Sequence, residues 1–411
     1  PPPPPPPPPP PRPPPPPHNK YIAFLGTVCS FIIFQSFFYE VAGAEEYSLP
    51  FMTISLYIFT KYYFTKKEPL VSHLIILGIC FAVSVFIRIN HFALWLGFCF
   101  VIFIEILSRK QWLLLLKYTL CFFAGILVVS IPILLYLRRN NALQDYINQN
   151  LFSGGSRAFT GFSIKYFVKS FWTIMHKNFC FMPFVAGFLW IAKKPKDIPI
   201  VYAFGFLFSY LLTIFFLAVI RTNFNHYNMI LTPFLVPAFA FCIKLIFTYF
   251  ADTKHKNSIA TLLLFLVFAG EIAKWLIAEY VDVIEGIKGK TRNELIAAGK
   301  TIDQCTNPGD TILSLGLSCQ IYLFTERQPA SRYIYQTSGA EYAPLMQEEF
   351  FSDLQKNKPA IIAIENNGGY DYLPDWYAPI YMMIEKEYQL LSDENGYYLF
   401  ILHSENKPPR P

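Results

Sequence analysis

Nine apolar stretches, each long enough to cross a lipid bilayer, constrain this chain more than any other feature of its sequence. A helix rises about 1.5 Å per residue and the hydrocarbon core is about 30 Å thick, so roughly 20 apolar residues span it. Their continuous apolar character predicts helices, because the strands of a membrane barrel would show short alternating segments. The stretches occupy residues 21–39, 47–64, 70–87, 91–107, 112–136, 178–192, 198–220, 227–250 and 258–281.

The composition supports this interpretation. Of 411 residues, 54% are hydrophobic and only 15% are charged, which excludes an ordinary soluble enzyme and a disordered chain. The net charge of +6 needs no nucleic acid to explain it, because lysine and arginine at the cytoplasmic ends of spans produce the same bias. We therefore expect a polytopic α-helical membrane protein that binds no nucleic acid.

Basic residues in the short loops predict the orientation of the spans. With the N-terminus in the cytoplasm, ten of these residues lie on the cytoplasmic side, against Arg88 and Arg221 on the other. Nine spans then place everything after residue 282 outside the cytoplasm. The ten residues are Lys61, Lys66, Lys67, Arg109, Lys110, Lys193, Lys194, Lys196, Lys254 and Lys256.

Three further regions flank or follow the membrane region, which we assign to residues 20–282. Residues 1–19 form a low-complexity tail in which proline excludes regular hydrogen-bonded structure, and 405–411 form a second disordered tail. Residues 283–404 alternate helical and strand patterns and predict an extracytoplasmic α/β domain. Its expected strands are TILSL, IYLF, AIIAI, QLLS and YYLFIL, and its expected helices lie near 291–304, 343–356 and 375–386.

The cysteines and metal-binding motifs add little. Only Cys305 and Cys319 share the predicted exported domain, where a disulfide between them is one alternative and free thiols are the other. The sequence holds no CxxC or HExxH motif, so it does not support a dedicated transition-metal site.

Polar side chains gather in the three short loops on the predicted outer side. Ionisable groups at membrane depth are costly, so they usually face a cavity or one another. Both signs of charge on one face would suit an anionic lipid-linked substrate, whose phosphate needs cations and whose acceptor needs a base. The residues are Glu40, Glu45 and Glu46 in the first loop, Arg88, Asn90 and His91 in the second, and Arg221, Asn223, Asn225, His226 and Tyr227 in the third.

Each of these residues also has a structural interpretation. An arginine at a span boundary often extends toward the lipid headgroups, and histidine and tyrosine there can serve as interfacial anchors. Glu45 and Glu46 begin a helix, where acidic side chains interact favourably with the helix dipole. The two interpretations stay open at this point.

Four segments resemble the GT-C superfamily of polytopic glycosyltransferases, namely the family 39-like enzymes that include aminoarabinose transferases and protein mannosyltransferases. In these enzymes the donor is a polyprenyl-phosphate sugar. The likeness covers most of the chain from residue 21 to about 400, and the order of the motifs makes it more specific than any one of them. The segments are GAEEYSLPF at 43–51, FIRINHFALW at 86–95, Arg221 to Pro233, and IYLFTERQPASRYIY at 321–335.

The resemblance implies an inverting transfer of a sugar to a glycan, lipid or protein acceptor outside the cytoplasm, in the plasma (inner) membrane. By analogy Arg221, His226 and Arg88 would bind the donor phosphate. Glu45 and Glu46 would be catalytic or bind a divalent metal ion, and the remaining lining residues would be Tyr227, Asn90 and Glu40. No cofactor other than such an ion is implied.

The chain departs from the family pattern at its start. The family carries a catalytic aspartate after its first span, yet no aspartate precedes Asp145 here. The sequence therefore resembles an N-terminally truncated member that lacks two or four spans and the usual base. The alternatives to a glycosyltransferase are a non-catalytic protein that binds or transports lipid-linked sugars, and a polymerase or ligase of surface polysaccharide.

Overall fold

The structure is a computed structural model in which contacts divide the chain into two units. Residues 1–139 and 162–275 form a helical unit, and residues 140–161 and 276–411 form a C-terminal unit. The residues described are 17–37, 43–65, 69–148, 150, 163–195, 198–219, 225–249, 290–315, 319–334, 344–365, 375–393 and 396–403, with scattered positions between 258 and 281.

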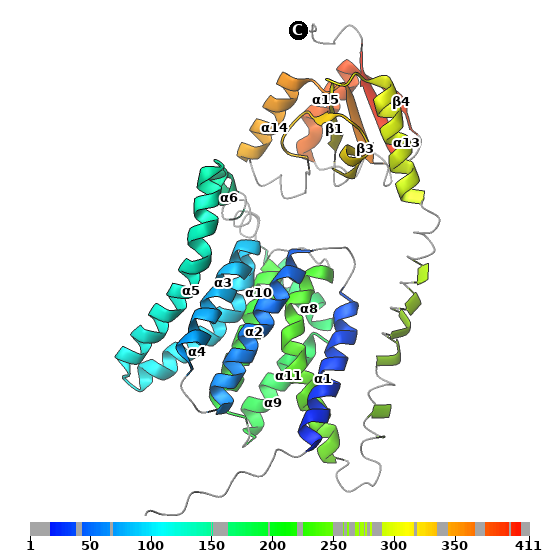
Figure 1. The fold of residues 1–411 in the computed structure, drawn as a ribbon. Helices are drawn as coiled ribbons and strands as arrows, with labels where there is room; N and C mark the ends of the chain where they lie inside the picture. The colour runs from blue at the N-terminus through cyan, green and yellow to red at the C-terminus, as the bar shows by residue number, and fades with distance from the viewer. Residues whose placement is uncertain are drawn as a thin grey trace, which may run out of the picture. The chain divides into compact units, whose positions relative to one another are not determined.

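The helical unit consists of long helices that pack side by side, with two short 3-10 turns among them (Figure 1). Seven of the nine predicted spans correspond to a helix within a few residues, and 178–192 corresponds to the shorter α9. For the predicted span 258–281 the structure describes only scattered helical positions. The elements are α1 (Pro17–Gln35), α2 (Ala44–Thr65), α3 (Val71–Ile87), η1 (Ile89–Phe92), α4 (Ala93–Ser108), α5 (Trp112–Arg139), α8 (Ile164–His176), α9 (Phe181–Lys193), α10 (Ile200–Val219), η3 (Asn225–Leu231) and α11 (Thr232–Tyr249).

By length and composition, the described residues hold four helices that can cross a membrane: 89–108, 112–139, 200–219 and 226–249. The pair α8 and α9, bent by 87° at its break, would make a fifth if it counts as one span. Residues 20–35 and 71–87 form shorter apolar helices. The four or five long apolar helices indicate a multi-pass membrane protein.

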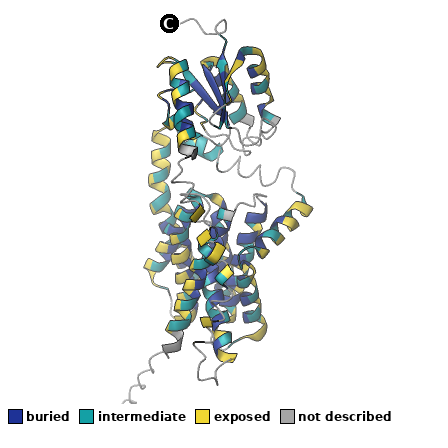
Figure 2. Cartoon of the chain, turned by 90° about the vertical axis from the view of Figure 1, so that its right-hand side faces the viewer, coloured by how far each residue is buried: buried dark blue, intermediate teal, exposed yellow. Residues whose placement is uncertain are grey.

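The outer surface of the helical unit is apolar, as lipid contact requires. Helix α5 buries only Tyr118 and Gly125 of its 28 residues, and Leu113 and Leu120 on it are 84% and 60% exposed. Figure 2 shows exposed residues along the outward faces of these helices. In water such a surface would be unstable, so this exposure agrees with a membrane setting.

Small residues bring pairs of helices close together. Gly78 of α3 and Gly125 of α5 face each other, and a β-carbon at either position would collide with the backbone of the other helix. The α4–α10 pair is joined similarly, because Ser209 packs against Gly97 and its hydroxyl donates to the Leu94 carbonyl at 2.9 Å. Close approach of this kind is how helices associate in lipid. These contacts hold α3 against α5 and α4 against α10. The segment between α3 and α4 carries the predicted site residues Arg88, Asn90 and His91.

The C-terminal unit contains a mixed five-stranded sheet in the order β2-β1-β3-β5-β4. Strand β1 is parallel to β2 and β3, whereas β5 is antiparallel to both β3 and β4. The predicted helices near 291–304, 343–356 and 375–386 are confirmed as α13, α14 and α15. The bounds are β1 Thr311–Leu315, β2 Gln328–Pro329, β3 Ile361–Glu365, β4 Tyr388–Ser392, β5 Tyr397–Leu402, α13 Lys290–Cys305, α14 Pro344–Asn357 and α15 Ala378–Glu387.

Helices cover both faces of this sheet. Alternate residues of β3 point to opposite faces: Ile361 and Ala363 pack in one core with α13, and Ile362 and Ile364 pack in the other with α14 and α15. A strand buried on both sides reads as a continuous apolar run. This explains why AIIAI was recognisable in the sequence.

One strand prediction in this unit is wrong. The segment IYLF lies mostly in a 3-10 turn, η4 (Cys319–Leu323), and the neighbouring strand is the short β2 instead. A short apolar run is ambiguous between helix and strand. Here Ile321 is buried in the core with α13, and the Tyr322 hydroxyl accepts a hydrogen bond from the Ser314 amide at 2.8 Å, which anchors the turn.

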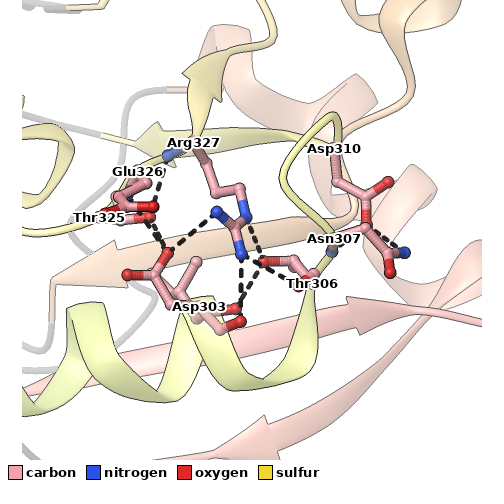
Figure 3. A network of polar contacts seen from close by, with 8 residues as sticks. Asp303, Thr306, Asn307, Asp310, Thr325, Glu326 and Arg327 are labelled. Carbon is pink, nitrogen blue, oxygen red and sulfur yellow. Dashed lines mark hydrogen bonds and ion pairs between the residues drawn. The ribbon is translucent and has the colours of Figure 1, made fainter.

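A buried arginine holds the end of α13 (Figure 3). The Arg327 side chain is 5% exposed and lies 3.4 Å from the Asp303 carboxylate. Its Nη2 donates to the carbonyls of Asp303 and Thr306 at 3.1 and 3.0 Å, and its Nε donates to the Thr306 hydroxyl at 2.8 Å. The last carbonyls of a helix lack partners within the helix, so Arg327 satisfies them and favourably places a positive charge at the negative end of the dipole.

Candidate functional site

The two glutamates predicted as catalytic begin α2, and the structure gives them different surroundings. Glu46 accepts a hydrogen bond from the Gly43 amide at 3.3 Å, and its own amide donates to the Gly43 carbonyl at 3.1 Å. The bond from the Gly43 amide to the Glu46 side chain is one half of a capping box, and it stabilises the helix start. Glu45, by contrast, is buried, with only 2% of its surface exposed. Helix capping therefore accounts for Glu46, whereas Glu45 needs another partner.

That partner is Arg88, which joins α3 to η1. Its Nη1 donates to Glu45 Oε1 in an ion pair between side chains that are 24% and 3% exposed. The face of the Tyr227 ring covers the guanidinium group, whose carbon lies 4.0 Å from the ring centroid. Among the residues that the structure describes, the other nitrogens of Arg88 make no hydrogen bond. Arg88 therefore keeps unused donors beside its paired carboxylate.

A second contact joins the same two segments three residues further on. His91 Nδ1 lies 2.7 Å from Ser48 Oγ, and both side chains are buried. We assign the single proton of the Ser48 hydroxyl to the Ala44 carbonyl, which lies 3.1 Å away, so that the hydroxyl accepts a hydrogen bond from His91. The proton of neutral His91 is thus on Nδ1, and Nε2 carries a lone pair that is buried and has no partner among the described residues.

The third polar loop contributes through η3. Tyr227 packs edge-on against the neighbouring His226, with ring centroids 4.4 Å apart, and both side chains are half-buried. Asn228, which the sequence analysis did not single out, is 3% exposed. Asn90, next to His91, is also buried, and its Oδ1 has no hydrogen-bond partner in the described part of the chain.

The structure thus brings together residues from all three predicted loops: Glu45, Arg88 and Tyr227. We call these residues, with Ser48 and His91, the polar cluster. Arg221, Asn223 and Glu40 lie outside the described residues, as does the Asn225 side chain. Ser48 was missed by the sequence analysis, although its spacing from Glu45 equals that of His91 from Arg88 and could have suggested a second pair.

The chemistry available to the polar cluster is anion binding and proton acceptance. A guanidinium group binds phosphate through several N–H donors, and Arg88 uses only Nη1 in its pair with Glu45. Proton acceptors are the Glu45 carboxylate and His91 Nε2. Within the described ranges, no group of three or more His, Cys, Asp or Glu side chains could hold a metal ion.

The arginine of the PASRY motif lies in a separate network on the C-terminal unit. Arg332 donates to Glu349 at 2.6 Å, to Asp145 at 2.9 Å and to the Tyr333 hydroxyl at 3.1 Å. The Tyr333 hydroxyl donates to Glu349 at 2.6 Å, and the hydrogen bonds from Tyr333 and Arg332 lower the pKa of Glu349. Asp145 belongs to α6 (Leu143–Ile147), which groups with this unit. The network therefore attaches α6 to the domain.

The chain was compared with protein families, curated proteins and solved structures. None of the three comparisons gives a match.

Proposed function

We propose that this chain is a membrane glycosyltransferase that moves a sugar from a polyprenyl-phosphate donor to an extracytoplasmic glycan, lipid or protein acceptor with inversion. The observation that carries the proposal is Arg88, a partly buried cation that pairs with Glu45 through one nitrogen and makes no other hydrogen bond to the described residues. A phosphate at this position would accept hydrogen bonds from the other nitrogens of Arg88. It would also receive electrostatic support as negative charge develops on the leaving group, usually a large catalytic effect.

The proposed topology places the polar cluster where such a donor would reach it. We propose nine spans, a cytoplasmic N-terminus, and a C-terminal unit outside the cytoplasm of the plasma (inner) membrane. The support is the distribution of basic residues, ten against two in the short loops. Glu45, Arg88 and Tyr227 would then lie at the outer mouth of the helical unit.

In the proposed reaction, the acceptor oxygen forms a bond to the anomeric carbon while the bond from that carbon to the phosphate oxygen breaks. The acceptor proton goes to a base, and the electron pair of the broken bond leaves with the phosphate. Either Glu45 or His91 Nε2 could take the proton. Arg88 would face the phosphate, with Arg221 and His226 assisting as the resemblance implies, and Tyr227 and Asn90 would line the site.

The second candidate is a protein that binds or transports lipid-linked sugars without transferring them. The ion pair itself favours this alternative, because it occupies the Glu45 carboxylate. Arg88 could then hold a phosphate while no free base lies beside it to take the acceptor proton. A divalent metal ion stays a proposal that the described residues do not support as a three-ligand site.

The test is donor turnover by the purified full chain in liposomes. Polyprenyl phosphates carrying labelled hexose, pentose or aminopentose are supplied with membrane glycan and lipid acceptors, and the free polyprenyl phosphate is quantified. A glycosyltransferase releases it only when acceptor is present, and Glu45→Gln together with Arg88→Gln slows the release by at least about a hundredfold, within the range of a lost charge-stabilising group. Donor binding without release would support the non-catalytic alternative and contradict the proposal.

A further inference from the structure

A groove of about 680 Å³ lies between α4, α9 and α10, away from the polar cluster. Its apolar walls are open to the surroundings, since Phe100, Ile104 and Phe204 are 50%, 46% and 50% exposed. Two of the four candidate spans carry these walls, residues 89–108 and 200–219. In a bilayer, such a groove would face lipid.

The dimensions of the groove match one leaflet. It is lined from Val201 to Leu211 of α10, a length of about 15 Å at about 1.5 Å per residue. The hydrocarbon core is about 30 Å thick, so the lining covers about half of it. On α4 the lining runs from Phe100 to Arg109, so the groove extends from the middle of that span to its end, where the headgroups of one leaflet would lie.

Polar residues gather at that end. Arg109 Nη2 donates to Glu105 Oε1 at 2.5 Å, and the Arg109 side chain is 60% exposed. The other carboxylate oxygen, Glu105 Oε2, is buried and has no hydrogen-bond partner in the described residues. Glu105 lines the groove and its side chain is 14% exposed, so a cation in the groove would be attracted to this carboxylate and could donate to it through an N–H group. The exposed cation one turn away would attract an anion.

We propose that this groove binds a phospholipid whose headgroup carries both a phosphate and a primary ammonium, as phosphatidylethanolamine does. The phosphate would lie on Arg109, the ammonium would pair with the Glu105 carboxylate, and one acyl chain would follow the apolar walls. A phosphatidylcholine headgroup has no N–H donor, and phosphatidylglycerol has no cation. The site does not depend on the proposed glycosyl transfer, because it uses none of the residues of the polar cluster.

The test is native mass spectrometry of the full chain exchanged into nanodiscs that contain equal phosphatidylethanolamine, phosphatidylcholine and phosphatidylglycerol. We expect retained phosphatidylethanolamine to exceed phosphatidylcholine by about tenfold, which one charge-assisted hydrogen bond can supply. Glu105→Gln should abolish this preference, whereas Arg109→Gln should weaken retention of all three lipids. Equal retention of the three lipids by the wild type, or an unchanged preference in Glu105→Gln, would overturn the proposal.

Two further variants test whether the lipid binds in the groove itself. Ile104→Trp fills the groove while leaving Glu105 and Arg109 in place, so it should also lose retained lipid. Lys110→Asn removes a neighbouring cation that does not line the groove, at a position with positive φ that asparagine tolerates. It should behave as wild type. Loss of the preference in Lys110→Asn but not in Glu105→Gln would contradict the assigned site.

Discussion

The guanidinium carbon of Arg88 lies 4.0 Å from the centroid of the Tyr227 ring, so a residue at the end of α3 rests on one that enters α11 through η3. The same guanidinium group pairs with Glu45 at the start of α2. Three segments distant in sequence thus meet at one cation. The cation–π contact and the ion pair hold Arg88 in a fixed position, as the recognition of an anion requires.

Breaking the ion pair on one side should destabilise the helical unit more than removing it completely. Arg88→Gln leaves Glu45 buried without a countercharge, and we expect a loss of about 3 kcal/mol or more in the free energy of unfolding. The double variant Glu45→Gln with Arg88→Gln should recover most of this loss, because two neutral amides can hydrogen-bond. Thermal unfolding in detergent of the wild type, Glu45→Gln, Arg88→Gln and the double variant measures the coupling, and additive effects would show that the two side chains do not interact.

Ser48 should act through His91. Ser48→Ala removes the group that accepts the Nδ1 proton of His91, with an expected loss of about 1 kcal/mol, and Ser48→Thr should retain the contact. The diagnostic measurement is the ¹⁵N chemical shifts of the His91 ring in labelled protein. The wild type and Ser48→Thr should show protonation at Nδ1 alone, whereas Ser48→Ala should show a mixture of tautomers. A wild-type ring protonated at Nε2 would contradict the assignment.

Close packing of α3 against α5 should make Gly78 intolerant of even a methyl group. A β-carbon there would collide with the Phe122 carbonyl, so Gly78→Ala should cost about 1–3 kcal/mol, as overpacking does. Gly309 is the matched control, because no atom lies within 4 Å of the β-carbon that alanine would add. The free energy of unfolding should fall in Gly78→Ala and stay near the wild-type value in Gly309→Ala. Equal stability of the two variants would mean that α3 and α5 are not in close contact.

The Glu349 network predicts the pH dependence of the C-terminal unit. Hydrogen bonds from Tyr333 and Arg332 lower the pKa of Glu349 in the folded protein. The stabilisation is therefore present above the pKa of the unfolded chain, and it is lost as pH falls through the lower, folded value. The Glu349 side chain is 41% exposed, so we expect less than about 1 kcal/mol.

Hydrogen exchange of α14 between pH 7 and pH 3 measures this effect. Once exchange rates are corrected for the intrinsic effect of pH, protection should fall in the acidic range. Glu349→Gln should reduce that fall, while Glu348→Gln serves as the neighbouring control. Identical pH profiles for Glu349→Gln and the wild type would contradict the role of the network.

The sequence predicted the helices well, because long apolar runs have few alternatives to a membrane helix. It also identified Glu45, Arg88 and Tyr227 as residues of one polar face. It could not predict that Arg88 would pair with Glu45, since pairing depends on how α2 and α3 are rotated about their axes. The roles of Ser48 and Gly78 were likewise hidden, because both depend on which helix lies opposite.

In the C-terminal unit, the residues that sequence reasoning misassigned are those with the weakest local signal. Strands β1 and β3 are continuous apolar runs buried on both faces, and they were recognisable. Strand β2 contains only Gln328 and Pro329 and exists because β1 offers it an edge. The segment IYLF has an apolar pattern that suits a strand or a helical turn, and core contacts of Ile321 decide between them.

The most direct test of a phosphate site at Arg88 is the affinity of the full chain in nanodiscs for a polyprenyl phosphate. The comparison is between wild type and the charge-neutral pair Glu45→Gln with Arg88→Gln, with Arg138→Gln as control. Arg138 is also an arginine near the end of a span, in the last turn of α5. We predict at least tenfold weaker binding for the pair, about 1.4 kcal/mol, and wild-type binding for Arg138→Gln. Equal affinity in all three proteins would contradict a phosphate site at Arg88.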